Sequence, residues 1–178
     1  MKIYTKKGDD GTTALMNGKR VRKNALQIAV CGELDELNSF AGLAKSKIHD
    51  KTINKQLLVI QSDLFIIGSN IADVNNSKAI HLTNKHVEQL ERWIDDMEAG
   101  LEPLSNFILP AGSEAVATLH VCRAVCRRAE RSLVALHEKG NIDATVLQYI
   151  NRLSDYFFLL ARFTAKINKE EETVWPLR

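Results

Sequence analysis

The segment between Ser113 and Gly140 carries a seam of small and apolar residues that only a long helix places on one side. Its members recur at alternating intervals of four and three: Ala115, Leu119, Cys122, Cys126, Ala129, Leu133 and Leu136. This spacing is typical of a helix face buried against neighbouring helices. Because one such helix cannot cover its own seam, the sequence predicts a helical bundle.

Four further stretches show spacings of three and four, and capping residues or breakers mark their ends. We expect five helices, over about 25–48, 53–73, 83–99, 113–140 and 143–168. The expected N-caps are Thr83, Ser113 and Asp143, and the expected break after the second helix is at Asn75, Asn76 and Ser77. The prediction is an all-α, five-helix antiparallel bundle, compatible with a ferritin-like topology.

The 178 residues are expected to form one domain, 1–178, with three parts. Residues 1–24 are polar and rich in glycine and lysine, which favours a short hairpin or ordered arm. Residues 25–168 form the bundle, with a proline-containing loop at 101–112, and residues 169–178 form a charged tail.

Composition excludes several classes of function. The net charge is only +2, which argues against a nucleic-acid partner and leaves a local anion site as the better interpretation. The most apolar run, 57–74, is interrupted by polar residues and is expected not to span a membrane. Three cysteines without a C-x-x-C pair favour a reducing cytoplasm over disulfides.

Charged residues border the seam of the fourth helix. With Cys126 at zero, Glu130 falls at ~40°, Arg123 at ~60° and Arg127 at ~100° around the helix axis. These three are expected to be partly desolvated, whereas Arg131 lies further round and Arg128 nearly opposite. Two interpretations stay open: a solvated face of weak salt bridges, or an arginine pair that binds a carboxylate or phosphate.

Three other candidate positions also have two interpretations. Asn151, at the edge of the apolar side of the fifth helix, is either a surface amide or a ligand for a ribose or base, and Arg162 is expected further out. Residues 107–113 either close over the core or offer anions a helix N-terminus. Asp35 is either a solvated carboxylate near a helix start or the partner of an arginine on the fourth helix.

The stretch TKKGDDGTT, residues 5–13, is either a turn between strands or a cradle for phosphates. It is not a Walker A loop, because it lacks G-x-x-x-x-G-K-[ST] and no long helix begins directly on its glycines. His120, Cys122 and Cys126 make a poor zinc site, because His120 points away from Cys126 on the helix.

Five segments, in this order, resemble those of the PduO-type ATP:cob(I)alamin adenosyltransferases. They are TKKGDDGTT at 5–13, CGELDELNS at 31–39, FILPAGS at 107–113, CRRAER at 126–131 and INRLSDYFFLLAR at 150–162. The resemblance spans almost the whole chain. It implies a five-helix homotrimer with active sites between subunits, and transfer of the 5′-deoxyadenosyl group of ATP to cob(I)alamin with release of triphosphate.

The resemblance also implies roles for single residues. Those matching the nucleotide site, with Mg²⁺ held through the phosphates and no protein metal ligand, are Thr5, Lys6, Lys7, Gly8, Asp9, Gly11, Thr12, Thr13, Lys23, Arg127, Arg128, Glu130, Arg131 and Asn151. Asp35 and Arg123 match a salt bridge across the subunit interface that helps to place the corrinoid. Phe107 matches an aromatic that takes over the lower face of the corrin, and Arg127, Glu130 and Phe107 are the expected catalytic residues.

The sequence departs from the family pattern at Ala111, Ala14 and Asn24, where members commonly carry glycine, glycine and aspartate. If position 111 needs a left-handed backbone, alanine costs ~1 kcal/mol there. We expect adjusted loops rather than lost activity, because neither alanine replaces a charge.

Other functions share these motifs. A non-catalytic, ATP-gated corrinoid carrier would need every one of them, a structural bundle would pair the basic face with its own acids, and a bundle nucleotide hydrolase would release orthophosphate. A cobalamin reductase and a B12-dependent enzyme are the further partners that the resemblance implies.

Overall fold

The computed structural model describes residues 2–72, 80–140 and 142–176. The elements in these residues are a hairpin and five helices: β1 (Thr12–Ala14), β2 (Arg20–Arg22), α1 (Leu26–Lys47), α2 (Lys51–Ala72), α3 (Asn84–Glu98), α4 (Glu114–His137) and α5 (Ala144–Ile167). All five predicted helices are present, with ends within about three residues of their expected positions. The predicted break at Asn75, Asn76 and Ser77 lies outside the described residues.

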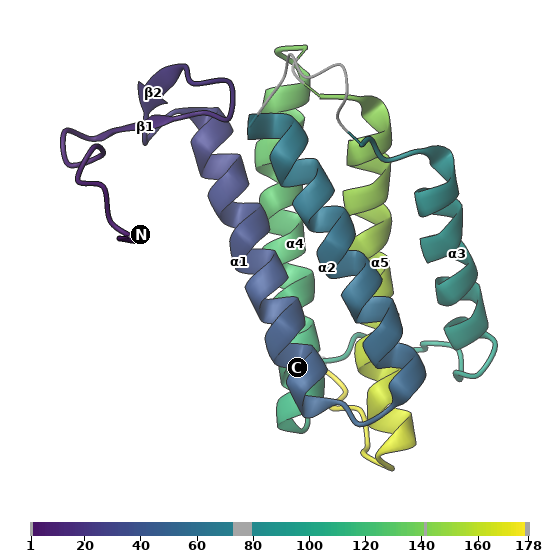
Figure 1. The fold of residues 1–178 in the computed structure, drawn as a ribbon. Coiled ribbons are helices and arrows are strands. Elements are labelled where there is room, and N and C mark those ends of the chain that lie inside the picture. The colour runs from purple at the N-terminus through teal and green to yellow at the C-terminus, as the bar shows by residue number, and fades with distance from the viewer. Residues whose placement is uncertain (1, 73–79, 141, 177–178) are drawn as a thin grey trace.

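The helices form a bundle in which α1 packs between α2 and α4, and α5 packs between α4 and α3 (Figure 1). The directions of α1, α2, α4 and α5 alternate around the bundle. The loop 101–112 connects the end of α3 to the start of α4 at the same end of the bundle, so these two helices run in opposite directions. Because α4 and α5 also run in opposite directions, α3 runs in the same direction as α5. The predicted all-α class is confirmed, and the hairpin holds the only named strands of the described chain.

The seam predicted for α4 is the centre of the core, and all seven of its members are buried. Two tyrosines of α5 bring polar atoms into the same interior. The hydroxyl of Tyr149 donates to Asp63 Oδ2 over 2.9 Å, and that of Tyr156 donates to Gln56 Oε1 over 2.8 Å. Burial raises the pKa of the Asp63 carboxyl, which suits an acid whose contact in the core is a hydroxyl.

Two of the three predicted N-caps act through their side chains. Thr83 forms a capping box with His86, and the Asp143 carboxylate accepts from the Thr145 amide over 2.7 Å. Ser113 is the N-cap residue of α4, but its side chain makes no capping bond. Its backbone N–H donates instead to Glu170 Oε2 over 2.7 Å, so a carboxylate from the C-terminal segment lies at this helix start.

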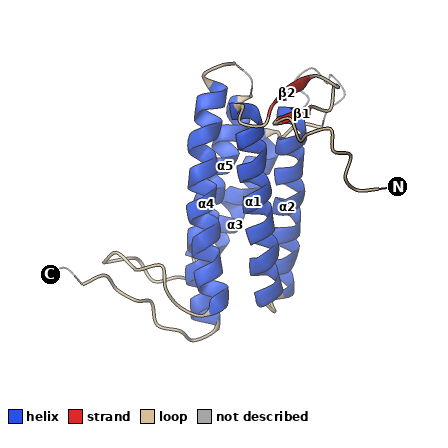
Figure 2. Ribbon diagram, turned by 90° about the vertical axis from the view of Figure 1, so that its left-hand side faces the viewer, coloured by secondary structure: helices blue, strands red, loops and turns tan. Residues whose placement is uncertain are grey.

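The hairpin and the C-terminal segment lie at opposite ends of the bundle (Figure 2). Residues 170–175, which we call the C-terminal strap, were expected to be part of a charged tail, but they pair with the loop before α4. Ile108 and Val174 form an antiparallel bridge. No helix of the described residues is long and apolar enough to cross a membrane.

Candidate functional site

The stretch TKKGDDGTT is a compact turn that leads into β1. The Gly11 amide donates to the Gly8 carbonyl over 3.2 Å, and the Lys23 amide donates to the Gly11 carbonyl over 2.9 Å. Gly11 and Lys6 have φ values of 79° and 58°, the left-handed region that disfavours a side chain such as that of Lys6. The turn therefore holds Lys6 in an uncommon backbone conformation.

Lys23 belongs to the same cluster. A Cβ atom placed on Gly8 would lie 3.1 Å from Lys23 Nζ and 3.1 Å from the Thr12 carbonyl oxygen. Gly8 thus allows the ammonium of Lys23 to lie directly against the turn. The structure thus brings together Lys23 and the glycine-rich turn, both of which the resemblance assigns to the nucleotide site.

Arg20 is a contributor to this cluster that sequence reasoning missed. Its guanidinium donates to the Lys7 carbonyl over 2.6 Å and also contacts Asp10 and the Thr12 hydroxyl. The amide and hydroxyl of Thr12 both donate to Asp10 Oδ1, which lowers the pKa of that carboxyl. The pairing of the two strands of the hairpin indicates this contact, because Arg20 lies opposite Ala14, which is two residues from Thr12.

The arginines of α4 are arranged differently from the prediction. Arg123 and Glu130 are half-buried as expected, but Arg127 is exposed. Arg128, expected nearly opposite the seam, is half-buried and forms an ion pair with Glu36 of α1. The reason is that α4 packs against both α1 and α5, so its buried face is wider than the seam and includes Val125.

Three arginines of this helix, Arg123, Arg127 and Arg131, have no carboxylate within ion-pair distance among the described residues. The Nε atom of Arg123 is buried and has no hydrogen-bond partner there. The side chain of Arg131 donates to the Arg127 carbonyl over 2.9 Å, which fixes it along the helix. Among the described residues, these three arginines are therefore not neutralised by a carboxylate, unlike Arg128, which pairs with Glu36.

Glu130 and Asn151 connect α4 and α5 beside these arginines. Asn151 Nδ2 donates to Glu130 Oε1 over 2.9 Å, and Asn151 is exposed. The hydrogen bond orients both side chains at one edge of the helix pair. The structure thus brings together two of the residues predicted for the nucleotide site.

Asp35 does not meet Arg123 within the chain. Asp35 is exposed on α1 and has no ion pair among the described residues. Its neighbours on α1 make the contacts to α4 instead: Glu36 binds Arg128, and Glu33 accepts from the Ser132 hydroxyl over 3.1 Å. The second carboxylate oxygen of Glu33 is buried without a partner in the described structure.

Phe107 lies at the other end of the bundle, with 78% of its surface exposed. Its ring lies edge-on to Trp175 of the strap, with the ring centroids 6.2 Å apart. In the following turn Gly112 has a φ of 131°, and a Cβ there would lie 2.8 Å from Val116 Cγ1. Ala111 does not have a positive φ, so alanine at this position does not incur the ~1 kcal/mol cost of a left-handed backbone.

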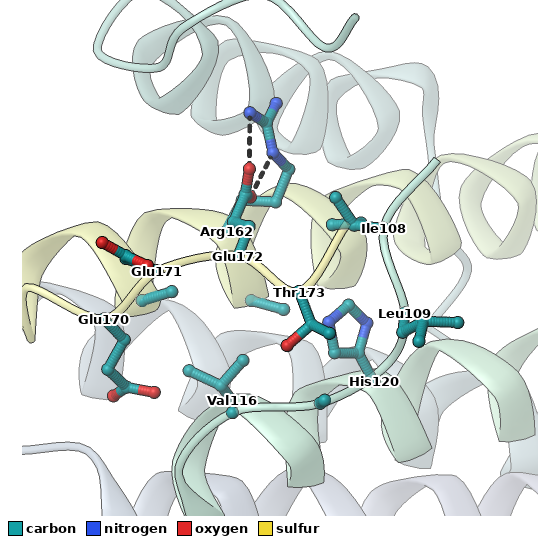
Figure 3. A pocket seen from close by; sticks show the side chains of 13 residues that line it. Ile108, Leu109, Val116, His120, Arg162, Glu170, Glu171, Glu172 and Thr173 are labelled. Atoms are coloured by element: carbon teal, nitrogen blue, oxygen red, sulfur yellow. Dashed lines mark hydrogen bonds and ion pairs between the residues drawn. The ribbon is translucent and has the colours of Figure 1, made fainter. Parts of the chain in front are cut away.

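Arg162 was expected on the outer side of α5, but it is buried, with only 7% of its surface exposed. Its Nε atom donates to Glu172 Oε1 over 2.6 Å (Figure 3). Its Nη2 atom donates to the Glu102 carbonyl over 2.9 Å. The prediction was wrong because the helix pattern gave no sign that the strap folds back over this face.

Within the described residues, the N-terminal turn and the α4 arginines make no hydrogen bond or ion pair with each other. The turn lies beside the start of α1, at one end of the bundle (Figures 1 and 2). The same residues contain no group of three or more His, Cys, Asp or Glu side chains able to hold a metal ion. One chain therefore presents two separate basic clusters rather than a closed nucleotide pocket.

Comparison with known proteins gives consistent matches. A family model described as cobalamin adenosyltransferase matches residues 3–164. A corrinoid adenosyltransferase of Bacillus subtilis is 45% identical over 166 residues, covering 91% of this chain and 86% of that protein. A cobalamin adenosyltransferase of Cupriavidus metallidurans is 41% identical over 175 residues, covering 98% and 94%.

Solved structures agree along the whole chain. A variant of the PduO-type ATP:corrinoid adenosyltransferase from Lactobacillus reuteri, complexed with cobalamin and ATP, superposes with a TM-score of 0.93. It is 35% identical, and the match covers 99% of this chain and 100% of that one. Another variant of the same protein, complexed with ATP, gives a TM-score of 0.91 at 37% identity.

Proposed function

The chain belongs to the cobalamin adenosyltransferase family, and from this premise we propose how its own residues transfer the 5′-deoxyadenosyl group of ATP to a corrinoid. The cosubstrate is ATP, the acceptor is cob(I)alamin or a related corrinoid, and the products are adenosylcobalamin and triphosphate. The observation that carries the proposal is the basic face of α4, where Arg123, Arg127 and Arg131 lack a carboxylate partner among the described residues. Arginine binds phosphates bidentately, so this face suits a polyphosphate.

The reaction needs no nucleophile from the protein. The cobalt of cob(I)alamin attacks the 5′ carbon of ATP, and a Co–C bond forms as the bond from C5′ to the triphosphate oxygen breaks. Cobalt is formally oxidised from +1 to +3, and the bonding pair leaves with the triphosphate. The protein has to hold the two reactants in line, stabilise the charge on the leaving group and exclude water.

We assign the leaving-group side to the N-terminal turn and α4. Arg127 and Lys6 bind phosphate oxygens, and Lys23 adds a positive charge against Gly8. Glu130, oriented by Asn151, positions Arg127 or the nucleotide. The remaining residues assigned to the nucleotide are Thr5, Lys7, Asp9, Gly11, Thr12, Thr13, Arg128 and Arg131. Of these, Thr12 also contacts Asp10, and Arg128 also contacts Glu36.

Mg²⁺ fits this arrangement as a partner of ATP. The described residues offer no cluster of ligands for a metal. Mg²⁺ in phosphoryl sites commonly keeps several waters and binds through substrate phosphates, for which no protein cage is needed. When bound, it supplies charge neutralisation at the triphosphate.

The corrinoid side is assigned to Phe107, Asp35 and Arg123. An exposed phenyl ring at the lower axial face would displace the lower ligand of cobalt, exclude water and make Co(II) easier to reduce. For Asp35 and Arg123 we propose the salt bridge between subunits, since each lacks an ion-pair partner within the described chain.

We propose a homotrimer in which the turn of one subunit closes on α4 of the next. The separation of the two basic clusters within one chain supports this assembly. A cytoplasmic location is in keeping with the three free cysteines. A cobalamin reductase that supplies Co(I) and a B12-dependent enzyme that receives the product are the proposed partners.

The decisive experiment is a single-turnover assay with chemically reduced cob(I)alamin, ATP and Mg²⁺. We expect the Co(I) spectrum to convert to that of adenosylcobalamin, with one triphosphate formed per corrinoid. Bound corrinoid without Co–C bond formation would identify a carrier, and orthophosphate as the inorganic product would identify a hydrolase. Either result contradicts the proposal.

A further inference from the structure

The C-terminal strap is joined to the loop that carries Phe107 by backbone hydrogen bonds. The Leu109 amide donates to the Thr173 carbonyl, and the Trp175 amide donates to the Phe107 carbonyl, each over 2.8 Å. Trp175 is also the aromatic neighbour of the Phe107 ring. Phe107 therefore contacts the strap through both its carbonyl and its ring, while most of its surface is exposed.

The strap is anchored to the bundle by a buried ion pair. Arg162 is 7% exposed, and its guanidinium contacts both oxygens of Glu172, Nε at 2.6 Å from Oε1 and Nη2 at 3.3 Å from Oε2 (Figure 3). A buried guanidinium that loses its carboxylate is left uncompensated, so the pair strongly disfavours detachment of Glu172. Glu170 makes a second, more exposed anchor through the Ser113 amide.

The same guanidinium also holds the beginning of the Phe107 loop. Arg162 Nη2 donates to the carbonyl of Glu102, five residues before Phe107. One buried side chain thus fixes both the start of the loop and the C-terminal strap, which pairs with the end of the loop. The cavity that Arg162 lines together with Glu172 has a volume of about 10 Å³, room for about one water molecule. A larger hollow of about 510 Å³, which Arg162 lines together with Glu102, lies beside the start of the loop.

We propose that Arg162 and Glu172 are positioning residues for adenosyl transfer: their ion pair holds the C-terminal strap, and through it Phe107, where the corrinoid binds. This inference rests on the role proposed above for Phe107. Neither residue touches the substrates. A displacement of about 1 Å at a positioning group can lower a rate on the order of a hundredfold, so a remote joint can control the reaction.

The test compares Glu172→Gln with Glu171→Gln in the full chain. Each substitution removes one negative charge from the same strap. Glu171 is exposed and makes no hydrogen bond or ion pair among the described residues, so it controls for charge alone. Glu172→Asp keeps the charge with a shorter reach and provides an intermediate variant if Glu172→Gln does not fold.

The first measurement is hydrogen exchange without substrates. We expect faster exchange of the Leu109 and Trp175 amides in Glu172→Gln, a smaller increase in Glu172→Asp and no change in Glu171→Gln. Unchanged exchange in both Glu172 variants would overturn the inference, whatever the function of Phe107.

The second measurement uses cob(II)alamin with ATP and steady-state kinetics. We expect Glu172→Gln to reduce the base-off fraction, that is, the fraction of bound corrinoid whose lower base has left the cobalt. We also expect it to lower kcat/KM for the corrinoid about ten- to a hundredfold. The KM for the corrinoid should rise while the KM for ATP stays within about twofold. General destabilisation would not produce this split, because loss of folded enzyme lowers the apparent kcat and leaves both KM values unchanged. Faster exchange without this split would also overturn the inference.

Phe107→Ala leaves the ion pair intact and therefore separates the role of Phe107 from the role of the Arg162–Glu172 ion pair. If it abolishes the base-off state while Glu172→Gln does not change it, the inference fails and the role of Phe107 stands. If Phe107→Ala itself leaves the base-off state unchanged, the proposed role of Phe107 fails and the inference falls with it.

Discussion

At the scale of single residues, Arg127 is the side chain whose exposure matters most. A phosphate-binding arginine must be reachable, and Arg127 is exposed on α4 with no carboxylate partner among the described residues. We predict that Arg127→Ala lowers kcat by about a hundredfold or more at saturating ATP, because charge on the leaving triphosphate is no longer stabilised. Single-turnover rates of adenosylcobalamin formation measure this directly.

Arg92→Ala is the matched control, since Arg92 is an exposed arginine on α3, outside the proposed site. Both substitutions are expected to change the free energy of unfolding by less than about 0.5 kcal/mol, as is usual for exposed positions. Near-normal turnover of Arg127→Ala would refute its assignment to the triphosphate.

His120 gives a prediction about pH. It is buried in α4, its Nδ1 atom has no partner in the described structure, and burial together with the nearby Arg123 lowers its pKa. Glu172 acts in the opposite direction but does not prevail. A histidine with a lowered folded-state pKa binds its proton more readily when unfolded, so its contribution to stability falls as pH drops below about 6.5.

We therefore predict that the wild-type chain loses more stability than His120→Gln between pH 7.5 and pH 5.5. Urea unfolding at each pH gives the difference, and carboxylates common to both proteins cancel in the comparison. Parallel pH dependences of the two proteins would show that His120 is not held neutral by its surroundings.

At the scale of elements, the sequence was sufficient for the helices. The spacing of three and four predicts each buried face, and local signals such as Asp143 and Thr83 mark where helices begin. Residues 170–175 were misjudged because their partners lie far away in the chain: Thr173 and Trp175 pair with the loop before α4. A run of charged residues has no periodicity to show that one of them, Glu172, meets a buried arginine.

The N-terminal turn leads to a third prediction. At Gly8 an added methyl group would meet Lys23 Nζ, which can move, and the Thr12 carbonyl, which cannot without opening the turn. We predict that Gly8→Ala raises the KM for ATP about three- to tenfold and leaves the KM for the corrinoid unchanged, because the ammonium is displaced from the phosphate side.

Gly32→Ala serves as its control, because nothing lies within 4 Å of a Cβ at this position in α1 and alanine favours a helix. Equal KM values for ATP in the two variants would contradict a role for the close approach of Lys23.

At the scale of the whole molecule, the sequence proposes the residues of the site but does not show how they are arranged. The motifs point to the N-terminal turn, the α4 arginines and Phe107. The turn lies at the hairpin end of the bundle, whereas Phe107 pairs with the C-terminal strap, which lies at the opposite end (Figure 2). The helical wheel misplaced Arg127 and Arg128 because it assumes a single buried direction, whereas α4 has neighbours on two sides. A single chain does not show the proposed contacts between subunits, but the buried Nε of Arg123, which has no partner among the described residues, leaves room for one.

The last prediction concerns those contacts. If Asp35 of one subunit binds Arg123 of the next, Asp35→Arg and Arg123→Asp each place like charges at every interface, which costs assembly energy. We predict that each single variant sediments largely as monomer at micromolar concentration, and that the double variant, with the pair reversed, regains the trimer and part of the activity. Asp95→Arg, an exposed position on α3, controls for the change in net charge and should leave the trimer intact. Trimers in both single variants, or a double variant no better than either, would show that the two residues do not meet across the interface. The buried Nε of Arg123, which has no partner among the described residues, would then require a different neighbour.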